Sequence, residues 1–265
     1  MRIDRLRLAS LLAAASIGLI ITTAPALAGP AMVAIIIDDL GNSLGEADRT
    51  AALPGNLTCS VLPHTPFATT AAETCRTAGK EVFVHLPMQP EDPRARPGPG
   101  VLVVGQTRDQ LREILRGDLA SVPGAVGVNN HMGSLLTRHI AYMDWVMSEL
   151  SLGGDLVFVD SATTTGSVAL RLATEYGLPT TRRDVFLDED PSPDAIHAQW
   201  ERLVGIAHAQ GAALAIGHPR DATLGFLAAE LETAADRDII LVSVTELIRA
   251  EQQRGQEPWP GLSSR

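Results

Sequence analysis

The feature that most constrains the fold is a regular alternation of short apolar runs with longer amphipathic stretches, in about eight steps. The apolar runs are residues 32–38, 57–62, 81–86, 125–128, 156–159, 180–182, 212–216 and 239–242, and the amphipathic stretches are residues 43–53, 67–78, 107–121, 138–152, 168–176, 192–210, 224–237 and 245–253. Strands that alternate with helices form a parallel sheet with the helices outside it. The number of steps predicts a single-domain α/β fold of the β/α-barrel type, with a doubly wound open sheet as the alternative.

The first 28 residues have the layout of a secretory signal peptide. Three arginines in the first seven residues precede an apolar run, which ends in an Ala-Leu-Ala cleavage sequence. The apolar run is too short for an ordinary membrane-spanning helix, which needs about 20 residues. We therefore expect a signal peptide over 1–28, a folded domain over 29–253 and a loose tail over 254–265. An uncleaved anchor is the alternative, and in both cases the domain is exported, with the periplasm as the expected location.

Charge and composition exclude several classes of partner. The net charge of −10 argues against a nucleic-acid-binding protein, which needs a basic face. After signal cleavage no later segment is long and apolar enough to enter a membrane. The chain has no G-x-G-x-x-G after its first strand, no P-loop and no G-x-S-x-G. Only 4% of the residues are aromatic, so a bound sugar chain would be held mainly by hydrogen bonds and a metal.

The two cysteines lie in consecutive predicted elements. Cys59 belongs to the apolar run 57–62 and Cys75 to the helical stretch 67–78. An exported protein can form a disulfide, but a helix packs with its axis roughly 10 Å from a sheet, whereas a disulfide needs Cα atoms within about 7 Å. We therefore expect two buried thiols.

Aspartates and histidines follow the predicted strands, at the edge where β/α proteins carry their functional sites. The polar residues at these strand ends are Asp38, Asp39, His64, His85, Asn129, Asn130, His131, Asp160, Arg183 and His218. One such histidine would usually be satisfied by a local hydrogen bond. Four of them facing an aspartate pair instead indicate a divalent metal site, with Zn²⁺ favoured and Mn²⁺, Co²⁺ or Ni²⁺ as alternatives.

The aspartate pair raises two further questions. Adjacent residues of a strand point to opposite faces, so Asp38 and Asp39 share a site only if the strand bends at its end, which Gly41 permits. A glycosidase that uses Asp38 and Asp160 as its carboxylate pair is a third reading. That reading leaves the histidines unexplained.

Several motifs resemble those of polysaccharide deacetylases. Residues 35–41 (IIIDDLG) are similar to the T-F-D-D-G motif of the NodB-type enzymes, and residues 79–90 (GKEVFVHLPMQP) to their motif G-x-E-x-x-x-H-x-x-x-H-P. Runs that resemble the divergent, YibQ-like polysaccharide deacetylases are 62–67, 85–88, 129–134, 182–188 and 217–219. The resemblance covers about residues 31–250. It implies a distorted (β/α)₇-like barrel and metal-dependent removal of N-acetyl groups from a polysaccharide.

The resemblance also implies roles for the matching residues. Asp38 matches the general base and Asp39 the metal-binding aspartate. His85 matches the first metal-binding histidine, but the second histidine of that motif falls on Gln89. A neutral amide is a poor replacement for imidazole on Zn²⁺. His131, from a neighbouring strand end, is the candidate for the missing ligand.

His218 matches the general acid that protonates the leaving amine, and Asn129 or Asn130 would stabilise the oxyanion or serve a local turn. The residues expected to contact substrate or support these groups are His64, Gln89, Asn130, Asp160 and Arg183. Two functions follow. The first is an exported deacetylase of a cell-wall or chitin-like glycan. The second is a catalytically degenerate envelope protein that binds glycan or regulates cell-wall enzymes, which Gln89 favours; its partners would include other cell-envelope proteins.

Overall fold

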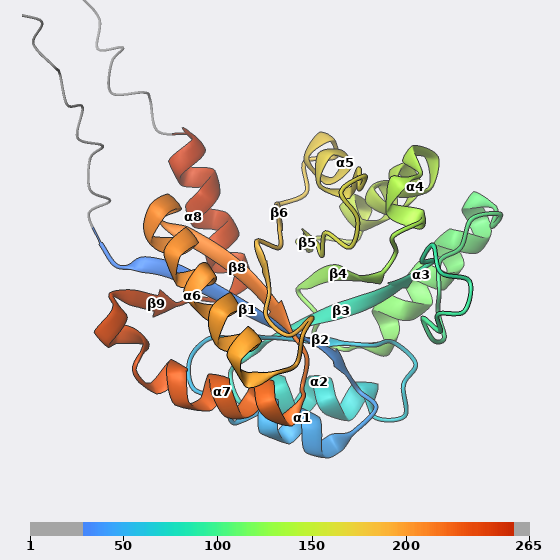
Figure 1. The fold of residues 1–265 in the computed structure, drawn as a ribbon. Helices are drawn as coiled ribbons and strands as arrows, with labels where there is room; N and C mark the ends of the chain where they lie inside the picture. The colour runs from blue at the N-terminus through green and yellow to red at the C-terminus, as the bar shows by residue number, and fades with distance from the viewer. Residues whose placement is uncertain (1–28, 257–265) are drawn as a thin grey trace, which may run out of the picture.

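The structure, a computed structural model, describes residues 29–256 and is built around one parallel sheet (Figure 1). The strands are β1 (Ala31–Leu40), β2 (Thr58–Val61), β3 (Glu81–Met88), β4 (Gly127–Met132), β5 (Val157–Asp160), β6 (Thr180–Arg182), β7 (Val185–Phe186), β8 (Ala212–Gly217) and β9 (Ile239–Leu241). The α-helices are α1 (Leu44–Ala51), α2 (Ala68–Thr77), α3 (Arg108–Ser121), α4 (Ile140–Leu152), α5 (Ala169–Glu175), α6 (Pro193–Gln210), α7 (Asp221–Glu232) and α8 (Val244–Gln256), and two short 3₁₀ helices are η1 (Leu136–Arg138) and η2 (Ala234–Arg237).

The ends of the chain bear on three sequence predictions. The predicted signal peptide, 1–28, and most of the predicted tail, 257–265, lie outside the described residues. Helix α8 continues to Gln256, three residues beyond its predicted end. Within residues 29–256, no helix is both long enough and apolar enough to cross a membrane.

The strand order confirms the predicted barrel-type fold. The sheet runs β6-β5-β4-β3-β2-β1-β8-β7, every pairing is parallel, and β9 pairs with β1 as a side branch. Strands that are consecutive in the sequence are therefore neighbours around the sheet, as in a barrel. In a doubly wound sheet the strand order starts in the middle and reverses direction there. In the described part of the chain no pairing joins β6 to β7, so the barrel is distorted and incompletely closed.

The first strand shows how the core is divided. Its β-branched run is buried on both faces, as expected for a central strand of a parallel sheet. Val33, Ile35 and Ile37 join the larger core, which the outer helices cover, while Ala34 and Ile36 face a smaller inner core. Three apolar side chains of α8 complete the inner core. Figure 1 accordingly shows α8 on the side of the sheet opposite α1 and α2.

The expectation of two free thiols is wrong, because Cys59 and Cys75 form a disulfide between β2 and α2. Their Cα atoms are 6.4 Å apart, within the range that a disulfide allows. Helix α2 turns small side chains, including Ala71 and Ala72, toward the sheet. The helix therefore lies close to β2, and the distance between two facing Cα atoms is shorter than the distance between the axes of the elements.

Candidate functional site

The end of β1 departs from regular strand geometry at the aspartate pair. The register of β1 on β2 shifts by one residue between Ile37 and Leu40, and Asp39 adopts a positive φ of 61°. This left-handed conformation costs a non-glycine residue about 1–2 kcal/mol, and such residues gather at functional sites. The bulge brings the carboxylates of Asp38 and Asp39 to the same cavity, so the strand bends where a shared site requires it.

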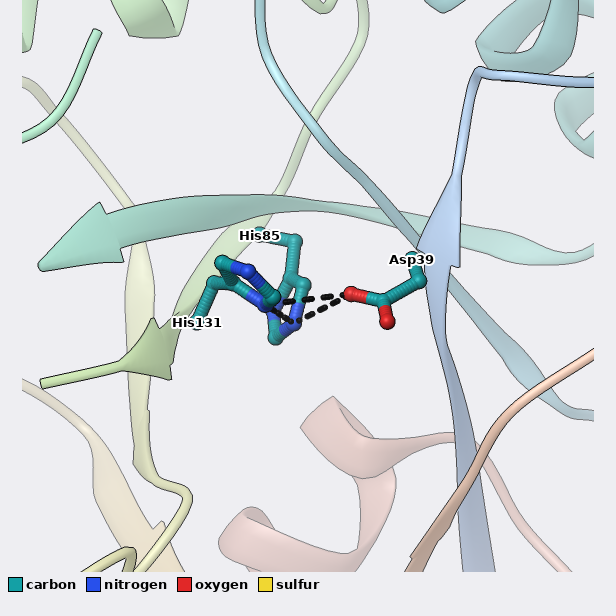
Figure 2. A group of neighbouring side chains, drawn as sticks. All are labelled: Asp39, His85 and His131. Carbon is teal, nitrogen blue, oxygen red and sulfur yellow. Dashed lines mark hydrogen bonds and ion pairs between the residues drawn. The ribbon is translucent and has the colours of Figure 1, made fainter. Parts of the chain in front are cut away.

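Three potential metal-binding atoms meet at the carboxyl ends of β1, β3 and β4 (Figure 2). His131 Nδ1 lies 3.1 Å from Asp39 Oδ1 and 3.1 Å from His85 Nε2. The third side of this triangle, from His85 Nε2 to Asp39 Oδ1, is 3.3 Å. Because parallel strands end at the same edge of a sheet, side chains more than ninety residues apart in the sequence converge here.

The electrostatics of Asp39 fit an ionised ligand. Burial alone would raise the pKa of this carboxyl, but the imidazoles of His131 and His85 more than reverse that effect and hold the pKa well below its usual range. Asp39 Oδ1 is nevertheless buried without a well-formed hydrogen bond to any of the described residues. A buried oxygen in this condition, facing two imidazole nitrogens, is suited to a shared cation.

The size of the triangle also fits a metal ion. A tetrahedral Zn²⁺ with ligands at about 2.0–2.1 Å separates its ligand atoms by about 3.3 Å, and the separations here are 3.1, 3.1 and 3.3 Å. One carboxylate and two imidazoles leave a fourth position of the tetrahedron for water or substrate, as in catalytic rather than structural zinc sites. Asp39, His85 and His131 therefore form a set that could hold a divalent cation.

Asp38 lies beside this triangle and is buried. Its Oδ2 is 3.4 Å from His85 Nε2, and its Oδ1 accepts a hydrogen bond of 2.9 Å from Asn129 Nδ2. Asn129 pairs with His85 in the register of β4 on β3. Asp38 is thus held at the edge of the candidate metal centre, within reach of a water molecule placed there.

His218 follows β8 and faces the triangle from the other side. Its Nε2 lies 3.6 Å from Asp39 Oδ2, and its Nδ1 lies 2.9 Å from Asp188 Oδ1. Burial would lower the pKa of His218, but the hydrogen bond to Asp188 and the charges of the nearby aspartates raise it above its usual value. Asp188 is fully buried and also accepts hydrogen bonds from His218 N and Thr223 Oγ1, both of 2.8 Å. This role was not predicted from the sequence, although Asp188 ends the run 182–188 that resembles the divergent polysaccharide deacetylases.

The site opens into a cavity of about 460 Å³. Its lining residues are Asp38, Asp39, His85, Asn130, His131, Met132, Ser161, Ala162, Thr163, Arg183, Phe186, Glu189, Ile216, His218 and Arg220. Phe186 is the one phenylalanine among these lining residues, which include no tyrosine or tryptophan. Its ring packs edge-to-face on His218, with ring centroids 5.4 Å apart. A larger cavity of about 850 Å³ lies at the amino ends of β3 to β6 and contains none of these residues.

The predicted supporting residues fall into two groups. Asn130 and Arg183 line the cavity; Arg183 Nε donates to Ser161 O at 2.7 Å, and its guanidinium lies 4.8 Å over the Phe186 ring. Asp160 accepts hydrogen bonds from Ala162 N and Ser167 Oγ and shapes a turn, without contacting Asp38 or His218 within residues 29–256.

Gln89 and His64 also lie away from the cavity lining. Gln89 Oε1 accepts a hydrogen bond of 2.8 Å from Val104 N and so holds the segment between β3 and α3. The His64 ring extends to α3, where its Nε2 lies 2.9 Å from Asp118 Oδ1. Both side chains organise loops around the site, and neither is placed to bind the candidate metal.

The buried carboxyl of Asp118 makes stability depend on pH. Burial raises the pKa of Asp118 to about 8. The folded protein therefore keeps this proton up to about pH 8, whereas the unfolded chain releases it near pH 4, so stability falls as pH rises between these values. From pH 6 to pH 8, we expect the free energy of unfolding to fall by about 2 kcal/mol more in the wild type than in Asp118→Asn.

Urea unfolding at pH 6, 7 and 8 measures this difference. Asp109→Asn is the matched control, because Asp109 lies on the same helix with its side chain 82% exposed. The control is expected to follow the wild-type pH dependence. Parallel pH profiles for the wild type and Asp118→Asn would show that Asp118 is already ionised in the folded protein.

A barrel-type α/β fold with aspartates and histidines at its strand ends is the architecture of a known family of proteins, to which the sequence can be matched. Residues 35–248 match the family model of the divergent polysaccharide deacetylases, and the chain belongs to this family. It is similar to the uncharacterized protein YibQ of Escherichia coli (strain K12), with 34% identity over 236 residues that cover 88% of this chain and 72% of YibQ.

Two crystal structures resemble the fold. The uncharacterized protein ATU2773 from Agrobacterium tumefaciens C58 aligns with a TM-score of 0.79 and 24% identity, over 83% of this chain and 90% of that one. Wild-type BA3943, a CE4 family pseudoenzyme from Bacillus anthracis, aligns with a TM-score of 0.50 and 15% identity, over 83% of this chain and 66% of that one. At these identities the likeness concerns the architecture alone.

Proposed function

We propose that this protein is an exported metal-dependent deacetylase that removes N-acetyl groups from a polysaccharide, such as a cell-wall or chitin-like glycan. The observation that carries the proposal is the convergence of Asp39 Oδ1, His85 Nε2 and His131 Nδ1 at 3.1–3.3 Å. Among residues 29–256, Asp39 Oδ1 has no well-formed hydrogen bond. Membership of the divergent polysaccharide deacetylase family supports the reaction class. The layout of residues 1–28 supports export to the periplasm.

In the proposed reaction Asp39, His85 and His131 hold a divalent cation, for which Zn²⁺ is the best match to the donor set. When bound, the cation polarises the amide carbonyl and lowers the pKa of a water molecule beside it. Asp38, held by Asn129, takes a proton from the attacking water. His218 gives a proton to the nitrogen as the carbon–nitrogen bond breaks, and the products are acetate and an amine.

The position of His218 suits the acid role. Its Nδ1 is engaged by Asp188, so its Nε2 is the nitrogen directed at the site. The raised pKa favours the protonated ring in the protein as it stands, which is the form that an acid needs. Asp38 and His218 come from β1 and from the end of β8, which are neighbouring strands, and both line the cavity that would admit the substrate.

Metal content measured together with acetate release tests the proposal. Protein purified without its signal segment and loaded with Zn²⁺ is expected to bind one ion per chain and to release acetate from an N-acetylated glycan. Acetate release should be lost on chelation and recovered when Zn²⁺ is returned. Protein that binds no divalent ion, or a His85→Ala variant with unchanged metal content, would overturn the metal centre.

A non-catalytic glycan-binding or regulatory protein of the envelope is the second candidate. Gln89, at the place where the related motif carries a histidine, is the observation that favours it. In that case Zn²⁺ would bind, yet no chitin-like or cell-wall substrate would yield acetate. Retention of glycan by the zinc-loaded protein under those conditions would support this candidate over the enzyme.

A further inference from the structure

The side-chain amide of Asn129 uses all of its hydrogen-bonding capacity inside the site. Its Nδ2 donates to Asp38 Oδ1 at 2.9 Å and to Ser161 Oγ at 3.2 Å. Its Oδ1 accepts from Ser60 Oγ at 2.5 Å and faces His85 Nδ1 at 3.2 Å. An amide offers two N–H donors and two acceptor positions, and the side chain is fully buried, so none remains for solvent or substrate.

The contact with Asp38 decides which way this amide points. In the reversed orientation the amide oxygen would face the carboxylate of Asp38, and two acceptors would repel each other. The observed orientation therefore presents the amide oxygen to His85 Nδ1, which must carry a proton to donate to it. Only Nε2 of His85 is then free to offer a lone pair to a cation, and Nε2 is the atom directed at the triangle.

We propose that Asn129 is a positioning residue that fixes two groups at once: its Nδ2 orients the Asp38 carboxylate, and its Oδ1 holds His85 with the proton on Nδ1. The part of this inference that concerns Asp38 rests on the proposed deacetylase function. The part that concerns His85 does not, because the hydrogen bond forms with or without catalysis. The oxyanion and turn roles expected from the sequence do not fit a side chain with no free donor.

Two variants separate the two halves of the amide. Asn129→Asp keeps an oxygen toward His85 but places a second carboxylate oxygen against Asp38, so the Zn²⁺ affinity should change less than about tenfold while acetate release slows by about 100-fold. Asn129→Leu removes both contacts in a side chain of similar volume. Its Zn²⁺ affinity should fall by about 10–100-fold, the usual cost of removing a group that supports a metal ligand.

Thr58→Val is the matched control, because Thr58 is also a fully buried polar residue of the sheet, on β2, and its hydroxyl bonds Glu81 instead. This variant should keep both the Zn²⁺ affinity and the acetate release of the wild type. If Asn129→Asp instead lowers both quantities together, in step with its melting temperature, Asn129 only stabilises the fold and the proposal is wrong.

Nitrogen-15 NMR of the histidine side chains gives a readout that needs no activity. In the metal-free protein, where no cation dictates the tautomer, His85 should show a slowly exchanging proton on Nδ1, which persists in Asn129→Asp and is lost in Asn129→Leu. A His85 ring with a bare Nδ1 in the wild type would overturn the inference, whether or not the protein releases acetate. Failure of acetate release alone, with this Nδ1 proton present, would contradict the proposed function and leave the His85 part standing.

Discussion

Replacing His131 by glutamine is expected to abolish stoichiometric Zn²⁺ binding and, with it, acetate release. His131 Nδ1 is equidistant, at 3.1 Å, from Asp39 Oδ1 and His85 Nε2, so its loss removes one of the three ligand atoms and leaves only the pair formed by Asp39 and His85. Loss of a group that only supports a metal ligand lowers metal affinity by about 10–100-fold. Loss of a ligand itself should therefore lower the Zn²⁺ affinity by more than this. Titration with Zn²⁺ and acetate assays on the same preparation measure the two effects.

A second variant asks whether position 89 can replace this ligand. The motif of the related deacetylases would place a histidine there, but Gln89 bonds Val104 N and its carbonyl accepts from Leu135 N and Leu136 N. These contacts tie the residue to the loops beside the site. We expect His131→Gln combined with Gln89→His to stay as defective as His131→Gln alone. Recovery of Zn²⁺ binding by the double variant would show that the ligand set assigned here is wrong.

The fold was predictable because its signal is distributed along the whole chain. Each strand of the parallel sheet is a buried apolar run and each helix has one apolar face, so the order of elements can be read without knowing any contact. Strand β7 was missed because two residues show no period. The disulfide was missed for a different reason: it depends on how closely α2 approaches β2, and small side chains decide this locally.

Only those residues of the candidate site that lie at the ends of predicted strands could be identified from the sequence. The sequence places Asp39, His85, His131 and His218 at or just after the ends of predicted parallel strands, and the structure brings them to one edge. The bulge that turns Asp39 has no signature in the sequence beyond a nearby glycine, because it depends on the register of β1 on β2.

Buried partners of the site were harder to foresee than the residues that face its cavity. Asp188 acts through His218 and Asn129 through His85, and neither follows from the type of residue alone. The single lysine shows the same difficulty, since Lys80 Nζ is buried against the carbonyls of Leu53 and Gly55, both at 2.5 Å. Such pairings depend on where two distant segments meet in the fold.

The second large effect is expected for Asp188→Asn, which should slow acetate release by about 100-fold or more while Zn²⁺ binding is kept. The carboxylate of Asp188 accepts three hydrogen bonds, and the donors His218 N and Thr223 Oγ1 share one of its oxygens. The amide oxygen of asparagine would take that position, so the amide NH₂ would face His218 Nδ1 in place of an acceptor. The protonated ring then loses both its hydrogen bond and its counter-charge.

The pH dependence distinguishes this mechanism from a general loss of structure. Asp188 helps to raise the pKa of His218 in the wild type, so the variant should have a lower pKa there and a smaller protonated fraction at neutral pH. The activity lost in Asp188→Asn should therefore be greater at pH 8 than at pH 5. Thr223→Val, which removes one donor to Asp188 but keeps its charge, should cost at most about tenfold. An activity loss in Asp188→Asn that is equal at both pH values would show that Asp188 does not act through the protonation of His218.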